Sequence, residues 1–327
     1  MRKSPRLEEA LPILYLRGLS TGDFVPALKA LLGEAVAGFS PSTIARLKDQ
    51  WRQEYHDWRK RDLSSEQYAY LWFDGVRFHV RMEDADLHCL VVIGVCRDGR
   101  KEVLAIEDGY RESTESWLAV LRHLRNRGLD SFEVAVGDGG LGLWAALGQA
   151  FPGVDQQLCW KHKLANVLDK LPKKVQPRAK QHLHEIMYAE TEADARSEAD
   201  AFEGEYSAKY PKAVASLTNN LDTLLTFFNY PAEHWIHLRT TNPIESPFST
   251  AKLRTRSTRG AGSRNAALGM TFKLLTSAEE RWRRVNSPHL IATVLAGIPF
   301  RDGQPTAPKG ESQPPPDAPE IRNRAAA

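Results

Sequence analysis

Residues 87–106, LHCLVVIGVCRDGRKEVLAI, contain two apolar runs separated by a turn sequence. The first run, Leu87 to Cys96, is apolar throughout, as expected for a strand buried at the centre of a sheet. Arg97-Asp-Gly-Arg100 is typical of a hairpin turn, and the run from Val103 to Ile106 follows it as a second strand. Upstream, Tyr68 to Val80 ends in an alternation of apolar and polar residues. The sequence therefore predicts three hairpin-linked strands.

Two helices and two further strands are predicted after these hairpins. Ser113 is a favourable helix N-cap and Gly128 is a favourable residue just beyond a helix C-terminus, so a helix is expected between them. A strand from Phe132 to Val136, a helix from Leu141 to Phe151 and a strand from Val154 to Cys159 complete the series. The order β-β-β-α-β-α-β is that of a ribonuclease-H-like mixed sheet with helices on both faces.

The first segment, residues 8–62, is predicted to be helical. Ser20-Thr-Gly-Asp23 and Ser40-Pro41 are both helix start signals. A short helix, a glycine-containing connection and a second helix with polar and basic first turns suit a helix-turn-helix. An ordinary helical hairpin is the alternative. The polar residues that would face DNA from the second helix are Ser42, Thr43, Arg46 and Lys48.

The remaining segments are distinguished by prolines and by charge. No strand pattern is present in residues 166–238, which prolines divide into helices, so this segment is predicted to be all-α. Residues 303–327 contain six prolines and are expected to form a disordered tail. The predicted units are therefore 8–62 (helix-turn-helix-like), 68–165 (first part of the core), 166–238 (all-α insertion), 239–302 (helices completing the core) and 303–327 (tail).

Composition limits the classes of protein that the chain can represent. Apolar residues make up 42% and charged residues 26% of the sequence, as in globular proteins. No apolar run is long enough to cross a bilayer, and no secretory signal precedes the first helix. The three cysteines are too few for a disulfide framework. We therefore expect no membrane partner and a cytoplasmic location.

Two aspartates follow or interrupt apolar strands. Asp74 lies in Leu71-Trp-Phe-Asp-Gly75, where a carboxylate is costly unless it is paired, forms a turn or binds metal; an Asp-Gly turn is the simplest interpretation. Asp138 lies just past the end of the fourth strand, which would be next to the first strand in the predicted sheet. Oxygen ligands that converge in this way suit Mg²⁺ or Mn²⁺. Two such ions can assist phosphoryl transfer.

A third carboxylate is expected from Glu245 in Thr240-Thr-Asn-Pro-Ile-Glu245. A capping box, in which Glu245 only reaches a backbone N–H, is the alternative. The chain's net charge is only +3, but residues 246–284 hold nine Lys/Arg and two Glu. A carboxylate followed by a basic helix suits a metal site beside a phosphate backbone. The basic residues that follow Glu245 most closely are Lys252, Arg254, Arg256 and Arg259.

Several of these motifs occur together and in order. They are Phe73-Asp74-Gly75, Gly137-Asp138-Gly139-Gly140-Leu-Gly142-Leu, Gln157-Leu-Cys159-Trp160-Lys-His162-Lys163, Thr241-Asn-Pro-Ile-Glu245-Ser246, Leu253-Arg-Thr-Arg256-Ser-Thr-Arg259-Gly260 and the region from Arg281-Trp282 to Pro288-His289-Leu290. Over about residues 11–300 the chain resembles the IS256/Mutator group of insertion-sequence transposases.

The resemblance implies a DDE transposase that cleaves element ends and transfers strands. It implies that Asp74, Asp138 and Glu245 bind the metal ions, and that residues 166–238 are the insertion typical of the family. Double-stranded DNA, both terminal repeats and target, is the implied partner, with a homo-oligomer and association with the nucleoid expected. Two features depart from the family pattern: the N-terminal region is short, and Pro247 closely follows Glu245.

Cys159-Trp-Lys-His162 corresponds to the family's C-x-x-H element. His162 is expected near the catalytic acids or DNA, and Trp160 either stacks on an exposed base or packs in the core. A zinc site would need two further ligands, for which His182 and His184 are the nearest candidates, but their spacing is unsuited to one helix face.

Three other functions remain open. Gly137-x-Gly-x-x-Gly142 resembles a dinucleotide-binding fingerprint, with Asp155 as its acid, but Asp138 would then face the pyrophosphate and the preceding strands lack crossover helices. A catalytically inactive helix-turn-helix protein is the non-enzymatic alternative. A nuclease of the same fold without strand transfer is the third.

Overall fold

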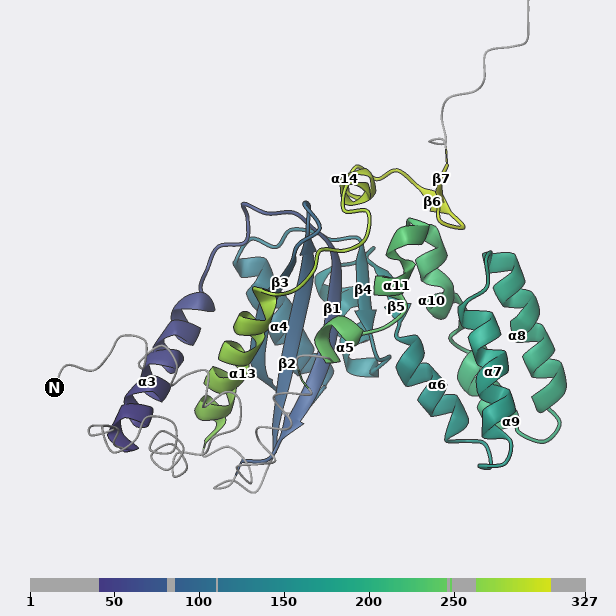
Figure 1. Ribbon diagram of the computed structural model, residues 1–327, viewed down its shortest axis with the longest axis horizontal. Coiled ribbons are helices and arrows are strands. Elements are labelled where there is room, and N and C mark those ends of the chain that lie inside the picture. The colour runs from purple at the N-terminus through teal and green to yellow at the C-terminus, as the bar shows by residue number, and fades with distance from the viewer. Residues whose placement is uncertain (1–40, 81–85, 110, 246–247, 249–262, 307–327) are drawn as a thin grey trace, which may run out of the picture.

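The computed structural model describes residues 41–80, 86–109, 111–245, 248 and 263–306 (Figure 1). Within the helix α3 (Pro41–Trp58), the side chains of residues 41–45, 47 and 48 are not described. The predicted helix start at Ser20, Pro247, the basic residues between 252 and 259 and the tail beyond residue 306 lie outside the described residues.

A five-stranded mixed sheet lies at the centre of the structure. Its spatial order is β3-β2-β1-β4-β5. The hairpin-linked strands β1, β2 and β3 are antiparallel, whereas β1 pairs in parallel with β4, and β4 with β5. The predicted adjacency of the first and fourth strands is confirmed. The strands are β1 (Tyr68–Phe78), β2 (Leu87–Cys96), β3 (Lys101–Gly109), β4 (Val134–Gly137) and β5 (Asp155–Leu158).

Alternation along the strands divides the core into two clusters. Leu71 and Phe73 of β1 pack in the cluster that contains the apolar faces of α4 (Thr114–Asn126) and α5 (Leu141–Ala150). Tyr70 and Trp72 point to the opposite face of the sheet, into a larger cluster that continues into the C-terminal helices. The predicted signals at the ends of α4 are confirmed: the Ser113 side chain accepts a hydrogen bond from Ser116 N–H, and Gly128 has a positive φ of 96°.

A group of helices follows β5 and extends to one side of the sheet (Figure 1). They share the larger core cluster with β1 and β4, so this segment is packed against the sheet. No strand occurs between residues 166 and 238, all of which are described. The elements are α6 (Trp160–Leu168), α7 (Gln176–Met187), α8 (Glu192–Tyr206), α9 (Pro211–Thr218), α10 (Leu221–Leu225), η2 (Thr226–Asn229), η3 (Ala232–His234) and α11 (Trp235–Leu238).

The last described elements are α13 (Arg264–Glu279), which packs against α3 and β3, α14 (Leu290–Leu295) and a short hairpin of β6 (Phe300–Arg301) and β7 (Gln304–Pro305). The prediction of a disordered tail from residue 303 is wrong for residues 303–306. Gly303 exchanges backbone hydrogen bonds with the helical segment, donating to Phe228 O and accepting from Ala232 N–H. Its positive φ of 77° forms the turn.

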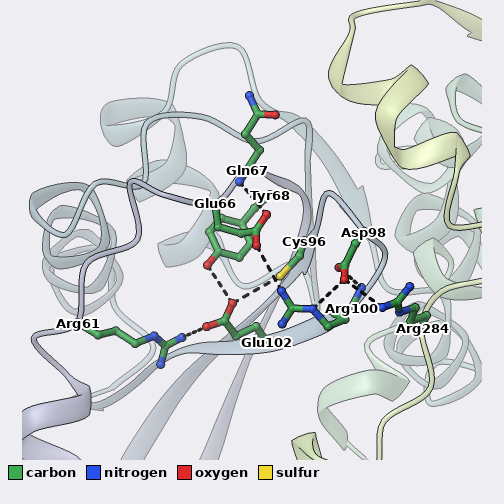
Figure 2. A network of polar contacts seen from close by, with 9 residues as sticks. All are labelled: Arg61, Glu66, Gln67, Tyr68, Cys96, Asp98, Arg100, Glu102 and Arg284. Atoms are coloured by element: carbon green, nitrogen blue, oxygen red, sulfur yellow. Dashed lines mark hydrogen bonds and ion pairs between the residues drawn. The ribbon is translucent and has the colours of Figure 1, made fainter.

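A polar network joins the segment after α3, the start of β1 and the β2–β3 hairpin (Figure 2). Glu102 of β3 accepts hydrogen bonds from Arg61, just after α3, and from the hydroxyl of Tyr68 at the start of β1. Asp98, in the predicted hairpin turn, pairs with Arg100 and with Arg284 after α13. Tyr68 lies six residues before Asp74 along β1, which corresponds to about 20 Å.

Among the described residues, no helix is both long and apolar enough to span a membrane.

Candidate active site

The two aspartates lie on adjacent strands of the sheet. Asp74 is within β1, paired with Val91, so the Asp-Gly turn interpretation is wrong. The parallel register pairs Tyr70 with Val134 and Trp72 with Val136. Continued at the same offset, it places Asp74 level with Asp138, which follows the last residue of β4. Neighbouring strands lie about 4.8 Å apart, so the two acids are held side by side.

Both aspartates belong to the face of the sheet that carries the larger core cluster. Asp74 alternates with Trp72 and Val76, and Asp138 follows Val136 by two residues; all three apolar residues belong to that cluster. Burial raises the pKa of Asp74 to about 7, partly offset by the positive charge of His162 and reinforced by the negative charges of Asp138, Glu112 and Glu245. The predicted acids therefore influence one another electrostatically.

Glu245 is positioned by the residues that precede it. The backbone carbonyl of Thr241 accepts the first helical hydrogen bonds, from the backbone N–H groups of Ile244 and Glu245. The Thr241 hydroxyl donates to Glu245 Oε1 at 3.0 Å. The other carboxylate oxygen of Glu245 pairs with Lys161. Glu245 thus bonds to two side chains rather than to the backbone N–H of a capping box.

Cys159 connects this turn to the strands that carry the aspartates. Its backbone N–H donates to Gly137 O at 2.7 Å, immediately before Asp138. Its sulfur accepts a hydrogen bond from Thr241 N–H and lies 3.3 Å from the Thr241 hydroxyl. Because that hydroxyl has one proton, it can donate to Glu245 while accepting from the thiol. Buried Cys159 and Thr241 therefore fix Glu245 relative to Asp138.

Cationic side chains come from the first turn of α6. The interaction of His162 with Cys159, opposed by burial and aided by the charges of Asp74 and Glu245, raises the pKa of His162 to about 9. Nδ1 of His162 is buried without a hydrogen-bond partner of good geometry. Hydrogen bonds from Lys161 and Thr241 outweigh burial and lower the pKa of Glu245. The structure thus brings the predicted residue His162 beside the acids.

Among the described residues, the candidate zinc ligands His182 and His184 are not grouped with Cys159 and His162. Within the part of the chain that the structure describes, ligand atoms of Cys159, His162 and Glu245 lie within 4.8 Å of one another. His182 instead belongs to a separate group with Glu185 and Glu198 on α7 and α8.

Two charged residues of the site were missed from the sequence. Lys161 lies inside the C-x-x-H element, where its pairing with Glu245, 84 residues away, has no local signal. Glu112 lies in the connection between β3 and α4. Burial and the nearby charge of Asp138 raise its pKa, whereas His162 lowers it. A glutamate beside a helix N-cap is ordinarily explained by the helix dipole, so its sequence position did not single it out.

The predicted DNA-binding residues have different outcomes. Trp160 is fully buried, and its indole N–H donates to Leu224 O, so it packs in the core and presents no surface for base stacking. Arg46 is exposed on α3. The side chains of Ser42, Thr43 and Lys48, and all of Lys252, Arg254, Arg256 and Arg259, lie outside the described residues.

Among the described residues, three of the cations counted between residues 246 and 284 pair with acidic residues. Arg264 pairs with Asp108 of β3 at 2.8 Å, and Lys273 pairs with Glu54 of α3. Arg284 pairs with Asp98 at 3.2 Å. These three charges help attach α13 and the segment after it to the rest of the fold.

Each of the two aspartates uses one carboxylate oxygen in a local hydrogen bond. Among the described residues, the groups of three or more ligand atoms within 4.8 Å of one another do not include Asp74 or Asp138. Asp74 Oδ1 accepts a hydrogen bond from Gly75 N–H, and Asp138 Oδ1 accepts one from Gly140 N–H. Among the described residues, neither Asp74 Oδ2 nor Asp138 Oδ2 makes a hydrogen bond or ion pair. Each aspartate therefore offers an oxygen ligand of the kind that Mg²⁺ and Mn²⁺ prefer.

Comparison with known proteins identifies a family over most of the chain. The family model "Transposase, Mutator family" matches residues 1–285. The transposase of insertion sequence IS6120 from Mycolicibacterium smegmatis is 53% identical over 298 residues, covering 91% of this chain and 92% of that protein. The transposase of IST2 from Acidithiobacillus ferrooxidans is 45% identical, covering 85% and 95%. The IS256 transposase of Tn4001 from Staphylococcus aureus is 27% identical, covering 86% and 72%.

Among solved structures, the Drosophila P element transposase strand transfer complex aligns over 90% of this chain and 91% of that chain, at 14% identity. Its TM-score of 0.28 is too low for any structural argument.

Proposed function

Because the chain belongs to the Mutator family of transposases, we propose that Asp74, Asp138 and Glu245 are the carboxylates with which it cleaves and joins DNA. DNA cleavage and strand transfer are the general activity of this family of insertion-sequence transposases. The observation that carries the assignment is the parallel register of β1 and β4, which brings Asp74 level with Asp138. Glu245 joins them through the hydrogen bonds from Cys159 to Gly137 and from Thr241 to Glu245.

The fold is proposed to be ribonuclease-H-like. The strand order β3-β2-β1-β4-β5, with α4 and α5 on one face, supports this assignment. We divide the chain as residues 8–62, a helix-turn-helix-like segment; 68–165 and 239–302, the two parts of the catalytic core; and 166–238, an all-α insertion. The packing of the insertion on the larger core cluster suggests that it supports the sheet face bearing the acids.

Two divalent ions, Mg²⁺ or Mn²⁺, are proposed to be held by Asp74, Asp138 and Glu245. When bound, they would activate the attacking oxygen and stabilise the leaving 3′ oxygen in phosphoryl transfer. Thr241 orients Glu245 through its hydroxyl. Lys161 lies on the exposed side of Glu245 and can neutralise either this carboxylate or an approaching DNA phosphate.

The partner is proposed to be double-stranded DNA, both the element ends and the target. Arg46, with Ser42, Thr43 and Lys48, is assigned to recognition of the element end by α3. Lys252, Arg254, Arg256 and Arg259 are assigned to the phosphate backbone next to Glu245. A homo-oligomer assembled on DNA would bring two ends together.

The experiment is incubation of the protein with its own element ends and Mg²⁺ or Mn²⁺, followed by assays of nicking and of joining to a target. Asp74→Asn, Asp138→Asn and Glu245→Gln should each abolish both reactions and preserve DNA binding, whereas the exposed Asp130→Asn should leave them unchanged. Undiminished nicking by all three variants would refute the triad. Nicking without joining would indicate a nuclease, and DNA binding with neither reaction in the unaltered protein would indicate an inactive DNA-binding protein.

A further inference from the structure

Glu112 lies against the backbone of β1 at the residue that follows Asp74. A Cβ atom at Gly75 would be 2.5 Å from Cδ of Glu112 and closer still to Oε1, whereas real Cβ atoms essentially never approach within 3.0 Å. Any larger residue at position 75 would require the Glu112 side chain to move away from β1. The glycine that follows Asp74 therefore lets this carboxylate lie against the strand.

A second glycine fixes the backbone of Glu112 close to Asp138. Gly142, in the first turn of α5 and four residues after Asp138, packs against residues 112–114. A Cβ atom at Gly142 would be 2.7 Å from the carbonyl carbon of Ser113 and even closer to the carbonyl oxygen of Glu112. A glycine therefore follows each aspartate and packs against Glu112. Gly75 contacts the Glu112 side chain, and Gly142 contacts the Glu112 backbone.

The Glu112 carboxylate is partly buried and, among the described residues, makes no hydrogen bond or ion pair. It is not needed to cap α4, because the Ser113 side chain already accepts the hydrogen bond from Ser116 N–H. The charges of Asp138 and His162 act on it, and its own charge acts on Asp74. Burial of an unpaired carboxylate costs free energy. The position of Glu112 against Gly75 and Gly142 is therefore better explained by a function than by stability.

We propose that Glu112 is a fourth carboxylate of the metal centre, held beside Asp74 and Asp138 by Gly75 and Gly142. This inference rests on the proposed function, because it requires that Asp74 and Asp138 bind divalent ions. Glu112 adds an oxygen ligand, direct or through bound water, from the β3–α4 connection. Glu245 comes from a different part of the fold, the turn at Thr241, where it pairs with Lys161 of α6. The proposed centre would therefore draw its acids from separate segments of the chain.

Titration calorimetry with Mn²⁺ in the absence of DNA provides a measurement independent of catalysis. Glu112→Gln should weaken Mn²⁺ binding by about tenfold or more, the range found for residues that support metal ligands. Glu115→Gln, an exposed glutamate on the first turn of α4, is the matched control and should bind Mn²⁺ as the unaltered protein does. Thermal unfolding should show that both variants remain folded.

Asp138→Asn separates failure of this inference from failure of the proposed function. If Asp138→Asn weakens Mn²⁺ binding and Glu112→Gln does not, the role of Glu112 is refuted while the triad stands. If neither variant changes Mn²⁺ binding, the metal centre itself is misplaced and both assignments fail.

Gly75→Ala tests the same inference without altering a carboxylate. The new methyl group should displace the Glu112 side chain and weaken Mn²⁺ binding, because Gly75 does not have a positive φ that would oppose alanine by itself. In a Glu112→Gln background the same substitution should have no additional effect, since the two changes act through one side chain. Independent, additive losses would overturn the proposed link between Gly75 and Glu112.

Discussion

Replacing Asp74 by asparagine should stabilise the metal-free protein while it abolishes DNA cleavage. The Asp74 carboxylate lies between the apolar residues Trp72 and Val76 on the sheet face, and Asp138 and Glu245 add negative charge. Ionisation of Asp74 is therefore unfavourable in the folded state. Asparagine has nearly the same shape and retains an oxygen that can accept the hydrogen bond from Gly75 N–H.

The size and sign of the effect follow from the pKa of Asp74. The folded pKa of about 7 lies above the ordinary value of 3.8, so folding favours the protonated acid. This contribution to stability is fully present below pH 3.8 and is lost as the pH rises through about 7. At about 1.36 kcal/mol per pH unit, the loss is at most about 4 kcal/mol. Asp74→Asn avoids it and should be more stable than the unaltered protein by up to that amount at pH 8.

Urea unfolding in EDTA, between pH 4 and pH 8, measures this difference directly. The free energies of unfolding of the two proteins should be similar at pH 4 and should diverge as the pH rises. Asp130→Asn, an exposed substitution, should show no such divergence. Added Mn²⁺ should stabilise the unaltered protein and not Asp74→Asn. A stability difference that stays constant across the pH range would refute the argument from burial and repulsion.

Three further outcomes are expected. Thr241→Val removes the hydroxyl that orients Glu245 and should reduce cleavage by about tenfold in a nicking assay with no change in DNA affinity; equal cleavage would show that Glu245 needs no such support. Burial raises the pKa of Glu279 to about 7, so the protonated side chain stabilises the folded protein and this contribution is lost as the pH rises through 7. The free energy of unfolding of Glu279→Gln in urea should therefore exceed that of the unaltered protein by about 2 kcal/mol at pH 8, after solvent screening, and should equal it near pH 4. Trp160→Ala should lower the free energy of unfolding by about 3–5 kcal/mol in urea, whereas lost DNA binding at unchanged stability would return Trp160 to the DNA surface.

The order of the strands was predictable because, along residues 68–165, the spacing of apolar residues and the residues typical of turns indicate the same strand and helix boundaries. The buried run from Leu87 to Cys96 became β2 with the predicted ends. Strand β3 is longer than predicted, Lys101–Gly109, because its charged residues lie at the edge of the sheet, where apolar patterning is weak. The hairpin at residues 300–305 was missed, since its strands have two residues each and depend on contacts with Phe228 and Ala232.

Residues of the site were predictable only where the local sequence around them is unusual. Asp74 and Asp138 stand out because each interrupts or ends an apolar strand. Glu112 and Lys161 do not, because their roles depend on contacts across the fold: Glu112 with Gly75, and Lys161 with Glu245. For Trp160 the sequence was equally consistent with a buried and an exposed side chain. Contacts between distant parts of the chain bury it completely.

We propose that the C-x-x-H element contributes to the charge balance of the site. Cys159 is the N-cap residue of α6, so Lys161 and His162 both project from the first turn of this helix, where the helix dipole is also positive. This positive helix end lies beside the carboxylates, as the effect of His162 on the pKa values of Asp74 and Glu245 shows. Partial neutralisation by α6 lowers the cost of gathering several acids at one edge of the sheet. The carboxylates that remain ionised would attract the proposed divalent ions.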